Sequence, residues 1–387
     1  MIKVLSILGT RPEAIKMAPV IRELAEYPDQ IISRVCVTAQ HRQMLDQVLG
    51  LFQIVPDYDL NAMQDAQSPT LVAATVFSKL EPILRAERPD WVLVQGDTTT
   101  VMAASIAAFY AQVKVGHVEA GLRTFDKTQP FPEEVNRRVA GVVADLHFVP
   151  TVKAGNNLLR ENVPAETIVL TGNPVIDALH AVCRMPYNLT SSPLKTIPLE
   201  RRILLVTAHR RENFGLPLAG ICKALQAIAY RYQDSVHIVY PVHLNPCIWE
   251  PVHQLLDGIP GITLVPPLDY LPLVQLLQRS YLVLTDSGGL QEEAPSLGKP
   301  VLVLRSTTER PEAIEAGTVK LIGTGCQRIV DETVRLLDDV QAYRQMARAI
   351  NPYGDGQAAQ RIIKALLAHD DVDVCGKAVL ELSHILE

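Results

Sequence analysis

Short apolar runs alternate with longer amphipathic stretches along most of this chain. The apolar runs are rich in β-branched residues and predict strands at 3–8, 33–38, 91–95, 113–118, 203–207, 236–240, 263–265, 281–285 and 300–304. Nearly continuous apolar runs are typical of strands buried on both faces of a parallel sheet. Stretches such as 12–25 and 216–232 place apolar residues three and four positions apart, which predicts helices. This alternation predicts an α/β fold with right-handed crossovers.

The two halves of the chain repeat one another. KVLSILGTRPE at 3–13 and RILLVTAHRRE at 202–212 each indicate a strand, then a small residue, a basic residue and a glutamate that opens a helix. WVLVQGD at 91–97 and YLVLTDS at 281–287 form a second pair. We therefore predict two Rossmann-like domains, at 1–171 and 172–354. The C-terminal segment 355–387 is expected to join the first domain through a helix that begins at Asp355.

Length and composition narrow the class of protein. A chain of 387 residues suits two domains rather than one core. Its net charge of -6 argues against a nucleic-acid partner. No apolar run is long enough to span a bilayer, and the N-terminus resembles a first strand rather than a signal peptide. The six cysteines lack paired spacing, which favours reduced thiols and a cytoplasmic location.

Polar residues that follow strand ends are the first candidates for chemistry, because parallel sheets bind ligands at that edge. In the first half these are Arg11, Asp97 and Glu119. In the second half they are His209, which precedes two arginines, and the segment Ser287–Gly289. Acids therefore gather in the first half, whereas basic and phosphate-binding groups gather in the second.

The segment Ser287, Gly288 and Gly289 opens a predicted helix, and a helix N-terminus is a ready phosphate site. A plain glycine turn with a capping serine is the alternative. His209 is interpreted as an anion contact rather than a packed core histidine. Helix capping is the alternative role for Asp97 and Glu119. The pattern lacks a dinucleotide loop, a P-loop and metal-ligand spacing, so we expect no cofactor and no metal.

Together these segments resemble the non-hydrolysing UDP-N-acetylglucosamine 2-epimerases along nearly the whole chain. The matching motifs include GTRPEAIKMAP from Gly9, QGDTTT from Gln95, GHVEAGLRT from Gly116, PFPEEVNR from Pro130, AHRRENFG from Ala208 and TDSGGLQEEAPSLGKPVL from Thr285. The resemblance implies the GT-B-like fold, with two Rossmann-like parallel sheets facing across a cleft. It makes 172–354 the UDP-binding domain.

The resemblance also implies the reaction. UDP-GlcNAc and UDP-ManNAc would be interconverted at C2 by elimination and re-addition of UDP, through a glycal-type intermediate and without a redox cofactor. Carboxylates would transfer the proton, and cationic or helix-end groups would stabilise the departing diphosphate. By motif position the catalytic candidates are Asp97, Glu119, Glu133 and His209. The substrate-binding candidates are Arg11, Lys16, Arg137, Ser287, Gly288, Gly289, Glu293 and Arg310.

A second UDP-GlcNAc, bound as an activator, is a further expectation from the resemblance. Its candidate contacts are Gln40, Gln43, Arg211 and His243. Ala66 stands where an arginine is expected to reach that activator, which predicts weaker activation. We also expect a homodimer, with no membrane or nucleic-acid partner, that supplies ManNAc-type sugars for cell-surface polysaccharide.

Three alternatives stay open on sequence grounds. A GT-B glycosyltransferase that uses UDP-GlcNAc would share the fold and the diphosphate site, but it would not need three acids in the first domain. A 2-epimerase for a modified UDP-diacetamido sugar would share the acids. A nucleotide-sugar sensor would not need them.

Overall fold

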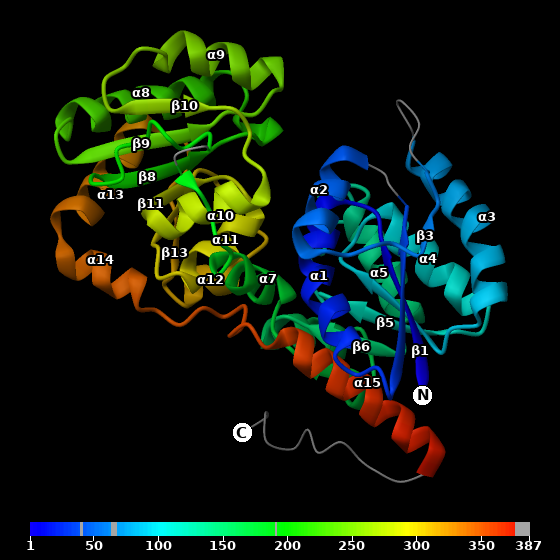
Figure 1. Ribbon diagram of the computed structural model, residues 1–387. Helices are drawn as coiled ribbons and strands as arrows, with labels where there is room; N and C mark the ends of the chain where they lie inside the picture. The colour runs from blue at the N-terminus through cyan, green and yellow to red at the C-terminus, as the bar shows by residue number, and fades with distance from the viewer. Residues whose placement is uncertain (39–41, 63–67, 190–191, 376–387) are drawn as a thin grey trace. The chain divides into compact units, whose positions relative to one another are not determined.

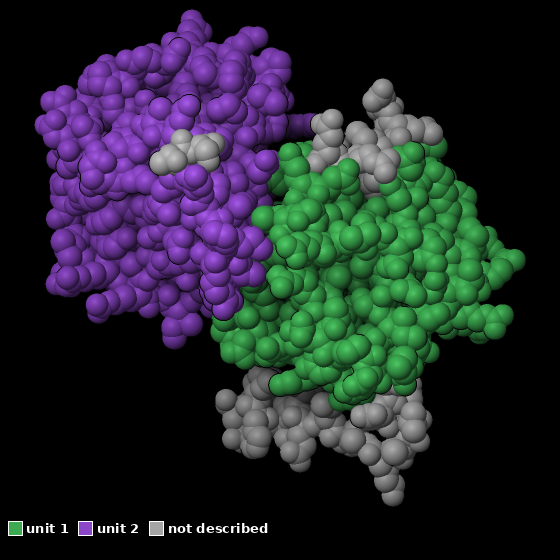
Figure 2. Space-filling model, viewed as in Figure 1, with its two compact units in different colours: residues 1–178, 353–387 green, residues 179–352 purple. Residues whose placement is uncertain are grey.

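The structure, a computed structural model, describes residues 1–38, 42–62, 68–189 and 192–375, the side chains at 42, 43 and 370–375 excepted. The chain divides into two compact units (Figure 2). Unit 1 comprises Met1–Ala178 and Tyr353–Glu387, and unit 2 comprises Leu179–Pro352. The chain therefore passes between the units twice, after Ala178 and again after Pro352.

Unit 1 is built on a seven-stranded sheet in the order β3-β2-β1-β4-β5-β6-β7, and all of its strand pairs are parallel. This is the doubly wound order, whose switch point lies between β1 and β4. The strands are β1 Ile2–Leu8, β2 Ile31–Val37, β3 Tyr58–Asp59, β4 Trp91–Gln95, β5 Lys114–Val118, β6 Leu146–Val149 and β7 Ile168–Leu170.

Helices cover both faces of this sheet, as the continuous apolar strands require (Figure 1). The helical segments of unit 1 are α1 Arg11–Ala25, α2 Arg42–Phe52, α3 Pro69–Glu87, α4 Thr99–Tyr110, α5 Glu133–Val143, α6 Val152–Arg160, the 3-10 turn η1 Ala165–Thr167 and α15 Ala358–Cys375. The helix α7 Pro174–Cys183 crosses from unit 1 to unit 2 after Ala178. The C-terminal helix α15 packs against α1, although it begins at Ala358 rather than at the predicted Asp355 (Figure 1). The start of α15 is set by Asp177, whose carboxylate accepts the backbone N–H groups of Ala358 and Ala359.

Unit 2 repeats the plan with a six-stranded parallel sheet in the order β10-β9-β8-β11-β12-β13. Its switch point lies between β8 and β11. The strands are β8 Arg202–Thr207, β9 Val236–Pro241, β10 Ile262–Val265, β11 Ser280–Thr285, β12 Val301–Val303 and β13 Val319–Leu321. The helical segments are η3 Arg211–Asn213, α8 Leu216–Arg231, α9 Pro246–Leu256, α10 Tyr270–Arg279, α11 Gly288–Ser296, α12 Pro311–Glu315, α13 Cys326–Asp338 and α14 Val340–Ala347.

Each of the nine predicted strands is present, with bounds that differ by at most a few residues. Four strands were missed: β3, β6, β7 and β13. They have between two and four residues, and β3 and β13 carry a charged residue. Such short runs are held by pairing with a longer neighbour, so their own periodicity does not distinguish them from loops.

Candidate active site

The helix that follows β1 begins with a capping box that fixes the first polar loop of unit 1. Glu13 is buried, and one of its carboxylate oxygens accepts the backbone N–H groups of Gly9 and Thr10, at 2.6 and 2.5 Å. Its other oxygen accepts the Thr98 hydroxyl at 2.6 Å, which ties the loop after β4 to the loop after β1. This arrangement begins α1 at Arg11 and places Lys16 in the same helix.

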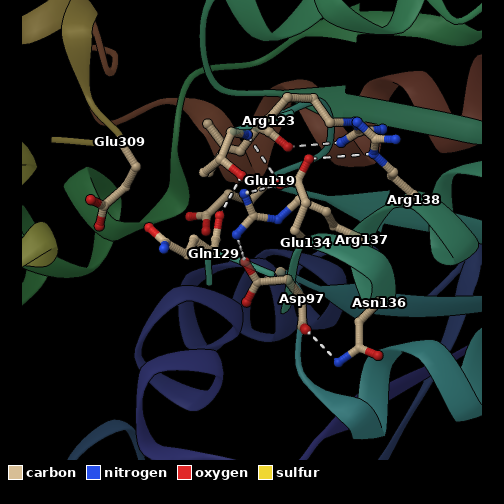
Figure 3. A network of polar contacts seen from close by, with 12 residues as sticks. Asp97, Glu119, Arg123, Gln129, Glu134, Asn136, Arg137, Arg138 and Glu309 are labelled. Atoms are coloured by element: carbon tan, nitrogen blue, oxygen red, sulfur yellow. Dashed lines mark hydrogen bonds and ion pairs between the residues drawn. The ribbon is translucent and has the colours of Figure 1, made fainter. Parts of the chain in front are cut away.

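Asp97 follows β4 directly and lies in the polar network drawn in Figure 3. Arg137 of α5 donates its guanidinium to the Asp97 carboxylate, and the Asn136 side chain donates to the Asp97 carbonyl at 3.0 Å. Burial raises the pKa of Asp97, Arg137 opposes that shift, and the nearby charge of Glu119 adds to it. The residue that caps α4 is Thr98, so capping is not the role of Asp97.

Glu119 follows β5 and is nearly buried, with 8% of its surface exposed. Its backbone adopts the left-handed conformation, with φ at 63°, which is unusual for a glutamate. The next helix in the chain begins only at Glu133, so capping is not the role of Glu119. Lys16 forms an ion pair with its Oε2 atom, and the Asn173 side-chain amide donates to the same oxygen at 2.7 Å. Glu119 is therefore a carboxylate held by one cation and one amide.

Glu133 is the first residue of α5 and is half-buried. Its Oε2 atom is buried and has no hydrogen-bond partner among the described residues. A carboxylate oxygen in that state is available to a ligand or to a proton.

In unit 2, the helix α11 begins at Gly288 directly after the N-capping Ser287. The Arg310 guanidinium lies over this helix end, because a Cβ atom at Gly288 would stand 2.8 Å from its Nη1. Glu292 accepts a hydrogen bond from Arg310 Nε at 2.5 Å, and Glu309 accepts one from Nη1 at 2.9 Å. The first N–H groups of a helix, with a guanidinium beside them, form a site for a phosphate-like anion.

One turn further along α11, Glu293 is buried and accepts the Tyr270 hydroxyl at 2.6 Å. Within the described residues this hydroxyl orients one carboxylate oxygen of Glu293. Its predicted role as a ribose contact stays a prediction.

His209 follows the end of β8. Its backbone is held by Asp286, whose side chain is fully buried. One oxygen of Asp286 accepts the backbone N–H groups of His209 and Arg210, at 2.7 and 2.8 Å. The other oxygen lies 3.5 Å from His209 Nδ1. Burial lowers the pKa of His209, while Asp286 opposes that shift. A neutral ring whose Nδ1 faces a carboxylate presents its Nε2 to a ligand.

Known sequences and a family model match most of this chain. A profile of the family described as UDP-N-acetylglucosamine 2-epimerase matches residues 22–367. The UDP-N-acetylglucosamine 2-epimerase of Yersinia pestis is 54% identical over 373 residues, which cover 95% of this chain and 99% of the relative. The enzyme of that name from Escherichia coli (strain K12) is 55% identical over 372 residues, covering 94% and 98%.

The chain belongs to the UDP-N-acetylglucosamine 2-epimerase family.

A solved structure supports the same assignment. The UDP-GlcNAc 2-epimerase of Neisseria meningitidis, crystallised with UDP-GlcNAc, has a TM-score of 0.86 and 48% identity over 95% of this chain and all of its own. The resemblance to the non-hydrolysing 2-epimerases and the GT-B-like fold, both predicted from sequence, are thereby confirmed.

The four candidate activator contacts lie in different settings. Arg211 and His243 are exposed in unit 2, and the His243 ring stacks on His209 at 5.7 Å between centroids. Gln40 and Ala66 lie outside the described residues, and Gln43 belongs to α2 without a described side chain.

The structure adds polar residues that the sequence reasoning did not select. Glu134 is fully buried and accepts the backbone N–H groups of Thr124 and Phe125, both at 3.1 Å, together with Arg137 Nη1 at 3.3 Å. The signal was available in the PFPEEVNR motif, where Glu134 and Arg137 stand three residues apart. Asp286 was also detectable, since it follows β11 directly.

The described part of the chain contains neither a membrane-spanning helix nor a cluster of metal-ligand side chains. No helix there has both the length and the apolar character needed to cross a bilayer. No group of three or more histidine, cysteine, aspartate or glutamate side chains there is arranged to hold a metal ion.

Proposed function

We propose that this protein is a UDP-N-acetylglucosamine 2-epimerase that interconverts UDP-GlcNAc and UDP-ManNAc. The observation that carries the proposal is the pair of carboxylates Asp97 and Glu119, which follow neighbouring strands of unit 1 and are each held by a different cation. Membership of the epimerase family supports the same reaction.

The chemistry explains why carboxylates are needed. The proton on C2 of the sugar has no adjacent carbonyl, so it is barely acidic. A base removes it while the C1–O bond breaks, and the electron pair of the C2–H bond forms the C1–C2 double bond as UDP leaves. Protonation at C2 from the opposite face and re-addition of UDP at C1 give the epimer. Atoms and electrons balance without an oxidant.

Unit 1 supplies candidates for the proton transfers. Asp97 and Glu119 have different environments: burial beside Arg137 for the first, and contact with Lys16 and Asn173 for the second. Different surroundings push the pKa values of neighbouring acids apart, which suits one acid to give a proton and the other to take it. The buried Oε2 atom of Glu133 is a third candidate.

Unit 2 supplies candidates for holding UDP. The α11 N-terminus with Ser287, Gly288 and Gly289 would bind the diphosphate through backbone N–H groups, assisted by Arg310 and His209. Arg11 and Lys16 of unit 1 are further proposed contacts, and Glu293 is the proposed ribose acceptor.

Three finer proposals accompany the reaction. A second UDP-GlcNAc would activate the enzyme through Gln40, Gln43, Arg211 and His243. The enzyme would work in the cytoplasm and supply ManNAc-type sugars for polysaccharide.

A homodimer is supported by exposed apolar side chains on the contacting helices α4 and α5, namely Phe109, Tyr110 and Val142. Sedimentation of the wild type and of Tyr110→Glu tests the dimer.

Incubation with UDP-GlcNAc alone in deuterated water tests the main proposal. An epimerase exchanges the C2 proton for deuterium and forms UDP-ManNAc, which proton NMR detects. A GT-B glycosyltransferase without acceptor and a nucleotide-sugar sensor leave C2 unlabelled, so the absence of exchange would reject the proposal. Exchange with a UDP-diacetamido sugar alone would establish the modified-sugar alternative.

A further inference from the structure

Asn173 lies where the loop after β7 meets the start of α7, and it is almost fully buried, at 1% exposure. Two of the contacts of its side chain require opposite ends of the amide. The Oδ1 atom accepts the backbone N–H of Val175 at 3.3 Å, as a residue that caps a helix does. The Nδ2 atom donates to Glu119 Oε2 at 2.7 Å. A flipped amide would lose both bonds, so the donor is held toward the carboxylate.

The backbone around Asn173 is fixed as well. Its N–H donates to the carbonyl of Tyr353 at 2.8 Å, and Tyr353 is the residue at which the chain re-enters unit 1. Beside it, Gly172 and Gly354 pack backbone against backbone, since a Cβ atom at Gly172 would stand 3.2 Å from the Gly354 Cα. Both glycines have a positive φ, of 83° and 117°. The two segments that lead to unit 2 are thus joined at the residue that contacts Glu119.

A buried amide in this position has a specific electrostatic effect. A donor to a carboxylate stabilises the ionised form and fixes the orientation of the carboxylate. The charged and titratable groups around Glu119 are Lys16 on α1, Asp97 after β4 and His117 on β5. The Lys16 ammonium group favours the ionised form of Glu119, and the neighbouring Asp97 carboxylate disfavours it. The Asn173 amide orients the Glu119 carboxylate without adding a charge.

We propose that Asn173 is a positioning residue for the reaction. Its side-chain amide orients Glu119 and stabilises the ionised carboxylate. Its backbone N–H joins the two segments that connect the units, so the orientation of Glu119 is linked to both of them. The proposal rests on the proposed function only in assigning Glu119 to proton transfer. The hydrogen-bond geometry stands independently of the reaction.

Two substitutions separate this role from helix capping. Ser and Asp both cap helices as well as Asn does, so Asn173→Ser and Asn173→Asp keep the start of α7. Asn173→Ser removes the donor to Glu119, and Asn173→Asp replaces it with a second carboxylate. The acidic limb of kcat/KM is expected to rise by about 0.5–1 pH unit in Asn173→Ser and by more than about 1 in Asn173→Asp. We expect kcat to fall about 10-fold or more while KM for UDP-GlcNAc stays within about twofold.

A direct titration gives a readout besides activity. In protein labelled at glutamate Cδ, the Glu119 resonance is assigned by its loss in Glu119→Gln, and its pKa is read by NMR in each variant. A rise in this pKa in both Asn173 variants supports the proposal, and an unchanged value overturns it. If the wild type exchanges no C2 proton, the proposed function fails while this titration still tests the role of Asn173.

Asp177→Ala is the matched control. It removes the carboxylate that caps α15 at the same joint but leaves the Glu119 contact in place. We expect a lower unfolding temperature without a change in the Glu119 pKa or in the acidic limb. An equal pKa rise in Asp177→Ala would mean that any loosening of the joint has this effect, and would overturn the specific role of Asn173.

Discussion

Unit 1 and unit 2 share the strand order of their central sheets, yet the polar residues that follow equivalent strands differ in exposure and in charge. After the fourth strand of unit 1, Asp97 is half-buried and paired with Arg137. After the equivalent strand of unit 2, Asp286 is fully buried and accepts backbone N–H groups. An acid at the same topological position is therefore a candidate catalyst in one unit and a scaffold in the other, and burial and partners decide which.

The comparison extends to how each unit treats negative charge. Unit 1 places carboxylates against lysine and arginine side chains, which suits proton transfer. Unit 2 places a helix N-terminus beside Arg310, which suits an anionic ligand. Substitutions of the carboxylates in unit 1 should therefore change turnover, and substitutions of the anion contacts in unit 2 should change binding.

The largest expected effect is on turnover. Asp97→Asn, Glu119→Gln and Glu133→Gln should each lower kcat by about 100-fold or more, because each removes a group able to transfer a proton. Each variant should bind UDP with near wild-type affinity, as measured by calorimetry. Wild-type rates in all three variants, or a loss of UDP affinity in place of turnover, would contradict the assignment of proton transfer to these carboxylates.

The second effect is on binding. His209→Ala and Arg310→Ala should each weaken UDP binding by about 1.5–3 kcal/mol, the range for hydrogen bonds to charged groups, or roughly 10–100-fold. Arg335→Ala is the control, because that exposed arginine forms an ion pair with Glu332 on its own helix, α13. Unchanged affinity in both site variants would place the diphosphate elsewhere.

The third effect concerns buried histidines and pH. Burial lowers the pKa of His117 from 6.5 to about 3, while its Nε2 lies 2.8 Å from the Gly96 carbonyl that precedes Asp97. Below pH 6.5 the unfolded chain binds a proton at His117, whereas the folded chain does not. Protonation of the unfolded state therefore lowers the free energy of unfolding as pH falls from 6.5. His117→Gln should reduce the slope of unfolding free energy against pH by up to about 1.4 kcal/mol per pH unit.

Denaturant titrations between pH 6.5 and 5 measure this slope. The chain has two tryptophans, Trp91 on β4 and Trp249. In a Trp249→Phe background, the fluorescence of Trp91 therefore reports the unfolding of unit 1. The control is the Trp249→Phe protein with His117 intact, whose slope should exceed that of the His117→Gln variant. An equal slope in His117→Gln and the wild type would contradict the assignment of a neutral buried ring.

The smallest effect compares two adjacent glycines. A Cβ atom at Gly288 meets the Arg310 guanidinium at 2.8 Å, whereas at Gly289 the nearest atom is 3.8 Å away. Gly288→Ala should therefore destabilise the protein by about 1 kcal/mol, and Gly289→Ala should stabilise it by up to about 0.5–1 kcal/mol through helix propensity. Thermal unfolding without ligand measures both. Equal changes would show that Arg310 does not occupy the helix end.

The Gly289 variant also sharpens the binding proposal. If the diphosphate approaches the backbone there, Gly289→Ala should fold stably and bind UDP more weakly. Unchanged affinity would indicate that the diphosphate approaches the backbone closely at Gly288 and not at Gly289.

The sequence by itself determined the two-domain α/β plan, nine of the strands and the candidate residues that follow them. These features are local: continuous apolar runs require two-sided burial, and a polar residue after such a run lies at the carboxyl edge of the sheet. Asp97, Glu119, His209 and Ser287 were found in this way.

Only the tertiary structure decided what each of these residues contacts. The partners of Glu119 are Lys16 and Asn173, which are 103 and 54 residues away in the chain. Glu134, Asp286 and Asn173 are buried polar residues whose roles depend on bonds to backbone groups of other loops. Periodicity reports which face of an element is buried, but a hydrogen bond between distant segments exists only once the sheet has brought their ends to one edge.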